Sequence, residues 1–284
     1  MAIIFDGKNQ ANLLTARLTK RVLMLSKKGI KPGLAVILVG DDQASKVYVH
    51  KKEQAAGSAG IFFKLFHYPA SARPEFLVGE IKKIVKDKKF SGVIIQWPLP
   101  KKLWLVARDL ADLITPEKDV DCLSRKSLAG IMMGEKMFIP PTPSAIFEVL
   151  NSAKISLAGK EVCLIGRGEL IGKPLAAMLL NLPITLTVCG RSTKNLSDYT
   201  KTADIIITAV GKSNLLTGAM IKSGAVVIDA GSSFIDGSQK GDIDFNSIVK
   251  KASLVTHTPG GVGPLTVAKL LENTVLASEL QGKK

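Results

Sequence analysis

The sequence predicts an α/β protein of two lobes, each built around a mostly parallel sheet, and three observations support this fold class. Apolar runs typical of buried strands alternate along the chain with helical patterns. The 284 residues are enough for two ordinary cores. Aromatic residues make up only 5% of the chain and hydrophobic residues 46%, so Val, Ile, Leu and Ala must fill those cores.

The first lobe is predicted from three apolar runs, each bounded by turn residues and followed by a helical pattern. Its strands are expected at 34–40, 61–67 and 92–96, and its helices at 45–59, 74–86 and 104–113. A stretch punctuated by glycine and proline, residues 130–143, then leads into a helix at 144–151. We therefore place the boundary between the lobes after residue 143.

The second lobe repeats the alternation with shorter elements. Its strands are expected at 161–165, 185–189, 204–210, 225–229 and 254–256. A long helical pattern at 264–276 follows, and we expect it to return to the first lobe.

Charge and cysteine content limit the class of protein. The net charge is +15, and residues 1–140 hold 24 basic against 13 acidic residues, a net +11. Few aromatic residues lie between the lysine pairs, so a solvated lysine surface is a simpler interpretation than a nucleic-acid site. A basic lobe would also attract a polyanionic small molecule. The three cysteines lack CxxC spacing and predict buried, reduced thiols: Cys122, Cys163 and Cys189.

The remaining composition argues against export and metal binding. Asp6 comes too early for a signal peptide, and no apolar run reaches membrane-spanning length. We expect a cytoplasmic protein without a membrane segment. The three histidines form neither an HxH nor an HExxH pattern, so no metal site is expected.

Two glycine clusters point to a bound ligand. Residues 258–266 hold three glycines and two prolines, which implies that backbone approaches a ligand closely. Gly166, Gly168 and Gly172 follow an apolar run in GxGxxxG spacing, one residue longer than the dinucleotide fingerprint. The first glycine permits a tight turn, the second clears the path of a phosphate, and the following helix offers free N–H groups. A structural turn is the alternative; together the clusters favour a Rossmann-like dinucleotide-binding lobe.

The expected cofactor is NADP. A site specific for NAD would usually carry an acid after its second strand, and no acid follows the strand at 185–189. Arg191 and Ser192, with Arg167 on the glycine loop, could instead contact a 2′-phosphate. Ordinary surface charge is the alternative for both arginines.

One polar pair in the first lobe could carry chemistry. Tyr48 and Lys52 are four residues apart, and so lie on the same face of the expected helix. A partly buried lysine can exchange protons near neutrality, and a tyrosine ring can support a flat heterocycle. From spacing alone, a solvated helix face remains the alternative.

Six segments in this order resemble the bifunctional methylenetetrahydrofolate dehydrogenase/methenyltetrahydrofolate cyclohydrolase family. They are Ser-Lys-Val-Tyr-Val with Lys52 at 45–52, Gln-Trp-Pro-Leu-Pro at 96–100, and the segments 116–121, 166–174, 209–212 and 259–266. The resemblance extends over nearly the whole chain. It implies a folate-binding catalytic domain at 1–143, completed by the carboxyl-terminal helix 264–284, and a Rossmann-like NADP-binding domain at 144–263. It also implies a homodimer that acts on tetrahydrofolate derivatives, which we expect to be polyglutamylated.

The resemblance implies a role for each matching residue. Lys52 would transfer protons in the cyclohydrolase step, Gln96 would hydrogen-bond it, Tyr48 would orient the folate, and Asp121 would accept hydrogen bonds from the pterin ring. Further substrate contacts are implied at Ser45, Pro98, Leu99, Pro259, Gly260 and Gly261. The implied cofactor contacts are Gly166, Arg167, Gly168, Gly172, Lys173, Pro174, Arg191, Ser192, Val210, Gly211, Gly231, Gly263 and Thr266.

Several positions depart from the family pattern. Where the family commonly has glycine after Asp-Val-Asp, this chain has Cys122. The other departures are Pro141 for Cys, Gly168 for Ser, Gly190-Arg191 for His-Ser, and Thr258 for Val. The catalytic candidates are all retained, so we expect an active enzyme. A dehydrogenase without cyclohydrolase activity and a basic nucleic-acid-binding protein are the alternatives.

Overall fold

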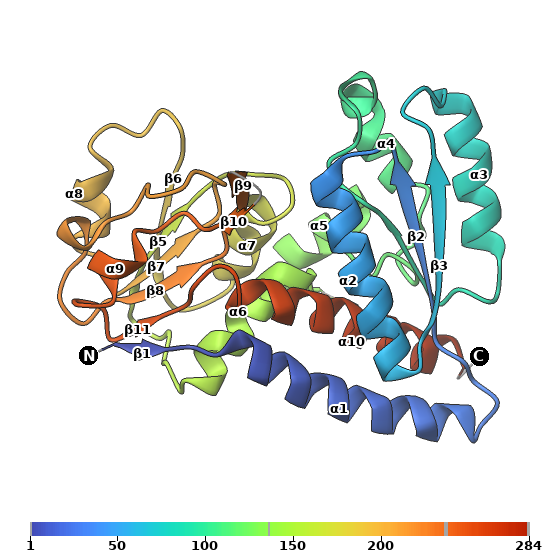
Figure 1. Cartoon of the computed structure of the whole chain (residues 1–284), viewed down its shortest axis with the longest axis horizontal. Coiled ribbons are helices and arrows are strands. Elements are labelled where there is room, and N and C mark those ends of the chain that lie inside the picture. The colour runs from blue at the N-terminus through green and yellow to red at the C-terminus, as the bar shows by residue number, and fades with distance from the viewer. Residues whose placement is uncertain (1, 136, 236–237, 283–284) are drawn as a thin grey trace. The chain divides into compact units, whose positions relative to one another are not determined.

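The computed structural model describes residues 2–135, 137–235 and 238–282, and it divides into two compact units (Figure 1). The three-stranded unit comprises Asn12–Ile131, Glu135–Pro141 and Val267–Lys284. The six-stranded unit comprises Met1–Ala11, Met132–Gly134 and Thr142–Thr266. Both contain parallel sheets and helices, so the two-lobe α/β fold predicted from the sequence is confirmed.

The three-stranded unit is built on a parallel sheet in the order β3-β2-β4. Its strands are β2 (Gly33–Val39), β3 (Phe62–Tyr68) and β4 (Gly92–Ile95). Its helical segments are most of α1 (Gly7–Ser26), α2 (Gln43–Ala59), α3 (Pro74–Lys86), η1 (Lys101–Val106), α4 (Ala107–Ala111), α5 (Arg125–Met132) and, from Val267, α10 (Val262–Gln281).

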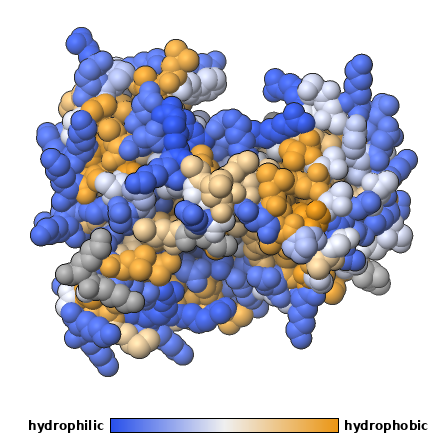
Figure 2. Space-filling view, turned by 180° about the vertical axis from the view of Figure 1, so that it is seen from behind, coloured by the Kyte–Doolittle hydropathy of each residue, from blue (hydrophilic) through white to orange (hydrophobic). Residues whose placement is uncertain are grey.

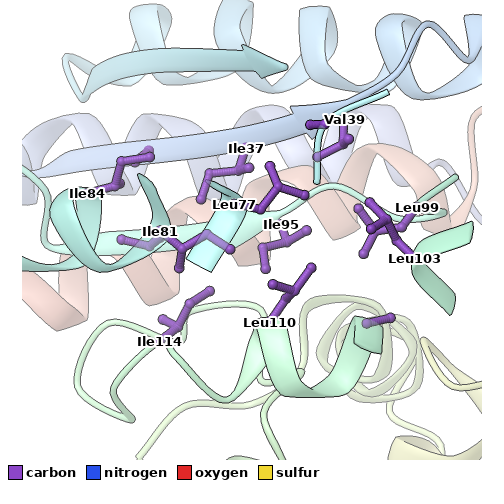
Figure 3. Close-up of a cluster of buried hydrophobic side chains, with 14 of the residues drawn as sticks. Ile37, Val39, Leu77, Ile81, Ile84, Ile95, Leu99, Leu103, Leu110 and Ile114 are labelled. Atoms are coloured by element: carbon purple, nitrogen blue, oxygen red, sulfur yellow. The ribbon is translucent and has the colours of Figure 1, made fainter. Parts of the chain in front are cut away.

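One hydrophobic core of this unit lies between the sheet and helices α3 and α4 (Figure 3). Every residue of β2 and β4 is buried because both faces of these strands are covered, which explains their continuous apolar runs. Ile37 and Ile95 are register partners in the sheet and pack with Leu77, Ile81 and Leu110 from the helices. The carboxyl end of β4 is thereby fixed against a rigid layer.

The six-stranded unit has a parallel sheet in the order β1-β11-β8-β7-β5-β6. Its strands are β1 (Ile3–Ile4), β5 (Glu161–Ile165), β6 (Thr185–Cys189), β7 (Ile205–Thr208), β8 (Val226–Asp229) and β11 (Leu254–Val255), with a separate hairpin of β9 (Ser233–Ile235) and β10 (Ser238–Lys240). Its helices are α6 (Pro141–Ser152), α7 (Gly172–Leu179), α8 (Leu196–Thr200), η2 (Gly218–Met220) and α9 (Phe245–Ile248).

Most sequence-predicted elements occur within a few residues of their expected positions, and the differences have physical reasons. Residues 104–113, expected to form one helix, instead form the end of η1 and then α4. Helix α1 was not predicted, although Leu14, Leu18 and Val22 recur at helical spacing and are buried. Residues 1–11, expected in the first lobe, lie in the six-stranded unit because β1 pairs with β11.

Hydrophilic and apolar side chains share the surface (Figure 2). On the face shown in Figure 2, hydrophilic side chains surround several apolar patches. All three cysteines are buried and free. None of the helices in the described ranges is both long enough and apolar enough to cross a bilayer.

Helix α10 is tied into the three-stranded unit by Asn273, which provides a stability test. The buried Asn273 amide donates to the carbonyl oxygens of Val120 (2.8 Å) and Ile139 (2.7 Å). Asn273→Leu removes both donors and should lower the free energy of unfolding by about 2–4 kcal/mol. Urea unfolding measures this loss. Leu280→Ala, at an exposed position of the same helix, should change it by less than about 0.5 kcal/mol; equal losses in the two variants would contradict this role of Asn273.

Candidate active site

Helix α2 carries the predicted lysine on its buried face. Its start is fixed by Asp42, whose carboxylate accepts a hydrogen bond from the Ser45 N–H (2.8 Å). From that point the buried positions recur at helical spacing and include Ser45, Val49 and Lys52. The amphipathic pattern therefore points the lysine inward, which spacing alone could not decide.

The Lys52 amine is hydrogen-bonded to the side chain of Gln96. Its Nζ donates to Oε1 of Gln96 at 2.8 Å, and both residues are only 9% exposed. Gln96 directly follows β4, where its backbone N–H donates to the Ile37 carbonyl (2.8 Å) and its Nε2 to the Trp97 carbonyl (2.7 Å). Because Nε2 is engaged, Oε1 is held toward the lysine as an acceptor.

Burial brings the pKa values of one amine and one carboxyl group in this site closer together. Burial lowers the pKa of Lys52, and the Asp121 carboxylate partly opposes this shift. Burial raises the pKa of Asp121 to about 6; Lys52 opposes that rise and Asp119 adds to it. Perturbed groups of opposite sign in one place are a feature of active sites.

Asp119 organises the turn that presents Asp121, and sequence reasoning missed it. Its buried carboxylate accepts from the backbone N–H groups of Leu123 (3.2 Å) and Ser124 (3.0 Å) and from the Ser127 hydroxyl (2.6 Å). The available signal was an acid followed five residues later by a serine at a helix start, a pattern typical of a capped turn.

Cys122 occupies a backbone conformation that favours glycine. Its φ is +57°, the left-handed region, and its side chain is buried. The family's usual glycine adopts this conformation without strain, whereas cysteine carries a cost of about 1–3 kcal/mol. Cys122 keeps this left-handed turn beside Asp121 in spite of the strain. Burial holds the pKa of its thiol well above the usual value.

The other substrate candidates of this unit differ in their exposure. Tyr48 is half-buried, one turn before Lys52, and the Lys51 ammonium lies 5.5 Å from its ring centroid. The Ser45 hydroxyl is buried and has no hydrogen-bond partner among the described residues. Pro98 is exposed, whereas Leu99 is 3% exposed and packs in the core, so its side chain anchors the segment that contains Gln96.

The glycine loop of the six-stranded unit connects β5 to α7. Gly166 has φ +129°, and its N–H donates to the Cys189 carbonyl (3.0 Å). A side chain at Gly166 would collide with the Ala209 carbonyl, and one at Gly172 with the Gly166 carbonyl, so both glycines are required by packing. By contrast, no heavy atom lies within 4 Å of the position a Cβ would take on Gly168. That open point leaves room for a phosphate group.

The basic candidates lie around this loop. The Arg167 guanidinium donates to the Val188 carbonyl (2.7 Å) and passes over Gly190, where a Cβ would lie 3.1 Å from its Nε. Gly190 thus makes room for Arg167. Arg191 and Ser192 are exposed in the turn that follows β6.

The remaining cofactor candidates are held mostly by contacts within the protein. The exposed Lys173 pairs with Glu169, and Pro174 is buried in the first turn of α7. Val210 is 46% exposed, and Gly211 has φ +74°. Gly231 faces the Asp242 carboxylate, with which any side chain there would collide, and its contact with a cofactor stays a prediction.

The segment 259–266 is shaped by its own backbone. Gly260 has φ +113°, and a side chain there would lie 2.6 Å from the His257 ring. The Gly261 N–H donates to the His257 carbonyl (2.8 Å). Pro259 is exposed, a Cβ on Gly263 would meet no heavy atom within 4 Å, and the Thr266 hydroxyl donates to the Val262 carbonyl (3.2 Å).

The candidates therefore divide by unit. Lys52, Gln96, Asp121 and Tyr48 belong to the three-stranded unit, and the glycine loop and segment 259–266 belong to the six-stranded unit. Among the residues that the structure describes, no group of three or more His, Cys, Asp or Glu side chains could hold a metal ion.

Comparison with known families decides the assignment. The catalytic-domain model of tetrahydrofolate dehydrogenase/cyclohydrolase matches residues 5–121, and the NAD(P)-binding-domain model of the same family matches residues 140–282. The chain belongs to the tetrahydrofolate dehydrogenase/cyclohydrolase family. The resemblance predicted from the six motifs is thereby confirmed.

Relatives of the tetrahydrofolate dehydrogenase/cyclohydrolase family match along their whole length. The bifunctional protein FolD of Bacillus pumilus is 42% identical over 279 residues, 98% of each chain. The crystal structure of the bifunctional FolD enzyme of Campylobacter jejuni has a TM-score of 0.95 at 37% identity, covering 99% of this chain and 100% of that one. The Trypanosoma brucei dehydrogenase-cyclohydrolase, complexed with NADP and an inhibitor, has a TM-score of 0.95 at 33% identity, covering 100% and 99%.

The raised pKa of Asp121 can be measured directly. The carboxyl ¹³C resonance of Asp121 should titrate with a midpoint near pH 6, because burial disfavours its charged form. Lys52→Met removes the neighbouring cation and should move the midpoint upward. Asp204 is an internal reference that should titrate below its usual range, because it is hydrogen-bonded to Lys222. Titration of Asp121 and Asp204 together near pH 4 would contradict the electrostatics described above.

Proposed function

We infer that this protein oxidises 5,10-methylenetetrahydrofolate to 5,10-methenyltetrahydrofolate with NADP and hydrolyses the product to 10-formyltetrahydrofolate. The observation that carries this inference is the buried Lys52 amine, hydrogen-bonded to Gln96 and near the Asp121 carboxyl group. Family membership supports the same pair of activities. Relatives named as bifunctional are about as long as this chain.

The site for NADP is supported by the glycine loop and the basic turn after β6. The open point at Gly168, next to the start of α7, leaves room for phosphate near the positive end of the helix dipole. Arg167, Arg191 and Ser192 would hold the 2′-phosphate. NADP, when bound, accepts the hydride from the one-carbon bridge of the folate, so the protein's contribution to this step is positioning.

The folate contacts are proposed from the three-stranded unit and the segment 259–261. Asp121 would accept hydrogen bonds from the pterin ring, and Tyr48 would orient it. The buried Ser45 hydroxyl, which has no partner among the described residues, would support the lysine region. Pro98 and the backbone of Pro259, Gly260 and Gly261 would contact substrate directly. The core packing of Leu99 supports an indirect role for its side chain.

Lys52 would carry the hydrolytic step. Attack of water on the methenyl cation yields 10-formyltetrahydrofolate and one proton. Because burial lowers the pKa of Lys52, a neutral amine is accessible to accept that proton. Gln96 holds the amine in place through an acceptor that is itself uncharged, so it adds no charge that would fix the lysine as a cation.

Two alternative functions are less well supported. A dehydrogenase that had lost the cyclohydrolase step would have no need for a buried lysine bonded to a glutamine, and this pair is intact. A basic nucleic-acid-binding protein would require neither the Lys52–Gln96 pair of one unit nor the glycine loop of the other.

Further properties are proposed with the function. We propose that residues 12–143 with 264–284 form the folate domain, and that residues 144–263 with 1–11 form the NADP domain. We also propose a homodimer and a cytoplasmic location consistent with three free cysteines. Light scattering tests the dimer.

The basic excess of residues 1–140 would attract polyglutamylated folate. Equal KM values for mono- and polyglutamylated substrate at low and high salt would refute the charge effect.

Replacing the lysine separates the two activities. Lys52→Met should reduce methenyltetrahydrofolate hydrolysis by at least about 100-fold, because the proton acceptor is lost, and reduce NADP-dependent oxidation less. Initial rates with each folate, followed spectrally, measure both steps. Lys51→Met, one residue away at an exposed position, should change neither rate by more than about twofold. Normal hydrolysis by folded Lys52→Met would refute the assignment.

A further inference from the structure

The loop that follows β7 turns its backbone N–H groups inward onto one buried carboxylate. The Val210 N–H donates to Oδ2 of Asp242 (2.7 Å) and the Lys212 N–H to Oδ1 (2.8 Å), and the Gly211 N–H also bonds this side chain. Asp242 is 0% exposed. Three successive N–H groups around an oxygen anion form a nest of the kind that binds phosphate elsewhere. Here the protein fills the nest with its own side chain.

The backbone of Asp242 holds the rest of the same loop. Its carbonyl accepts from the N–H groups of Leu215 (2.7 Å) and Leu216 (3.2 Å). The Asp244 N–H returns a hydrogen bond to the Leu216 carbonyl (2.8 Å). Residues 210–216 are therefore anchored at both ends to the short segment around Asp242.

Asp242 is itself placed by a second buried acid. Its N–H is shared between the two carboxylate oxygens of Asp229 (both 3.1 Å), and Asp229 also accepts from the Gly231 N–H (3.0 Å). Two glycines make room for this arrangement. A side chain at Gly231 would collide with the Asp242 carboxyl group, and one at Gly241 with that of Asp229. Gly231 is thus required by an acid of the protein, independently of any cofactor.

The strand order indicates which half of a dinucleotide the loop faces. The order of sheet growth reverses between the neighbours β5 and β7, and dinucleotides bind across the crevice at such a switch point. The glycine loop follows β5, and Arg191 and Ser192 follow β6 on its far side. If these hold the 2′-phosphate, the loop after β7 lies on the side of the nicotinamide half.

We propose that Asp242 is a positioning residue for NADP, which fixes the Val210–Gly211 backbone so that the nicotinamide half of the cofactor binds in one orientation. Asp229 orders Asp242 for this task. The proposal rests on the proposed function, since it requires that this unit bind NADP.

The decisive variant is Asp242→Asn, which keeps the size of the side chain but turns one acceptor oxygen into a donor facing an inward N–H group. We expect the Kd and the KM of NADP to rise about tenfold or more. Binding of 2′,5′-ADP, which lacks the nicotinamide half, should be unchanged, and so should hydrolysis of methenyltetrahydrofolate, which uses no NADP. A residue of purely structural importance would not produce this selective loss.

Asp244→Asn is the matched control, because Asp244 lies two residues away and its side chain makes no hydrogen bond to the start of α9. All three measurements should stay at the wild-type level in this variant. Unchanged NADP binding by folded Asp242→Asn would overturn the proposal, and so would a parallel loss of NADP binding, 2′,5′-ADP binding and hydrolysis. Failure of the wild-type protein to bind either nucleotide would instead reject the proposed function.

A measurement on the wild-type protein keeps the proposal testable if Asp242→Asn fails to fold. The amides of Val210 and Lys212 should be protected from hydrogen exchange without NADP, although the Val210 side chain is exposed, because both are bonded to a buried carboxylate. They should remain protected when NADP is added. Fast exchange in the free protein, slowed only by NADP, would show that the cofactor orders the loop and would overturn the proposal.

Discussion

The chemistry of the three-stranded unit depends on keeping one amine out of water. Burial lowers the pKa of Lys52, and a buried ammonium ion without compensation would be too costly to keep charged. Gln96 supplies an acceptor of fixed orientation, and the Asp121 carboxylate restores part of the lost solvation. The parallel sheet serves this arrangement because β4 ends directly before Gln96 and is buried on both faces. A shift in that strand would move the acceptor.

In the six-stranded unit, the main structural constraint is the placement of the loops that follow the strands. The loops at the carboxyl ends of its strands contain many glycines, and several of these glycines pack against other parts of the same unit. Gly166 and Gly172 pack on backbone carbonyls, and Gly231 packs on Asp242. Buried carboxylates then hold loop N–H groups by charge-assisted hydrogen bonds, which are stronger than bonds between neutral groups. Rigid loops in turn reduce the entropy that cofactor binding must overcome.

The sequence was sufficient for the sheets, for most helices and for the family. A continuous apolar run such as that of β2 predicts a buried strand when such runs alternate with helical patterns. Six motifs in a fixed order identify a family far more specifically than any one motif. It was insufficient where tertiary contacts decide. The role of Asp119 depends on a turn closed by Ser124 and Ser127. A glycine such as Gly231 looks the same in sequence whether a ligand or a carboxylate approaches it.

The most direct test of a buried, proton-exchanging amine is the pKa of Lys52 itself, measured by NMR of its Nζ or Cε in the folded protein. We expect a value below the usual ~10.4 for lysine, because burial disfavours the ammonium form. In Asp121→Asn it should fall further, because the carboxylate that favours the ammonium form is gone. An ordinary pKa in the wild-type protein, unaffected by Asp121→Asn, would contradict the proposed role of Lys52 in hydrolysis.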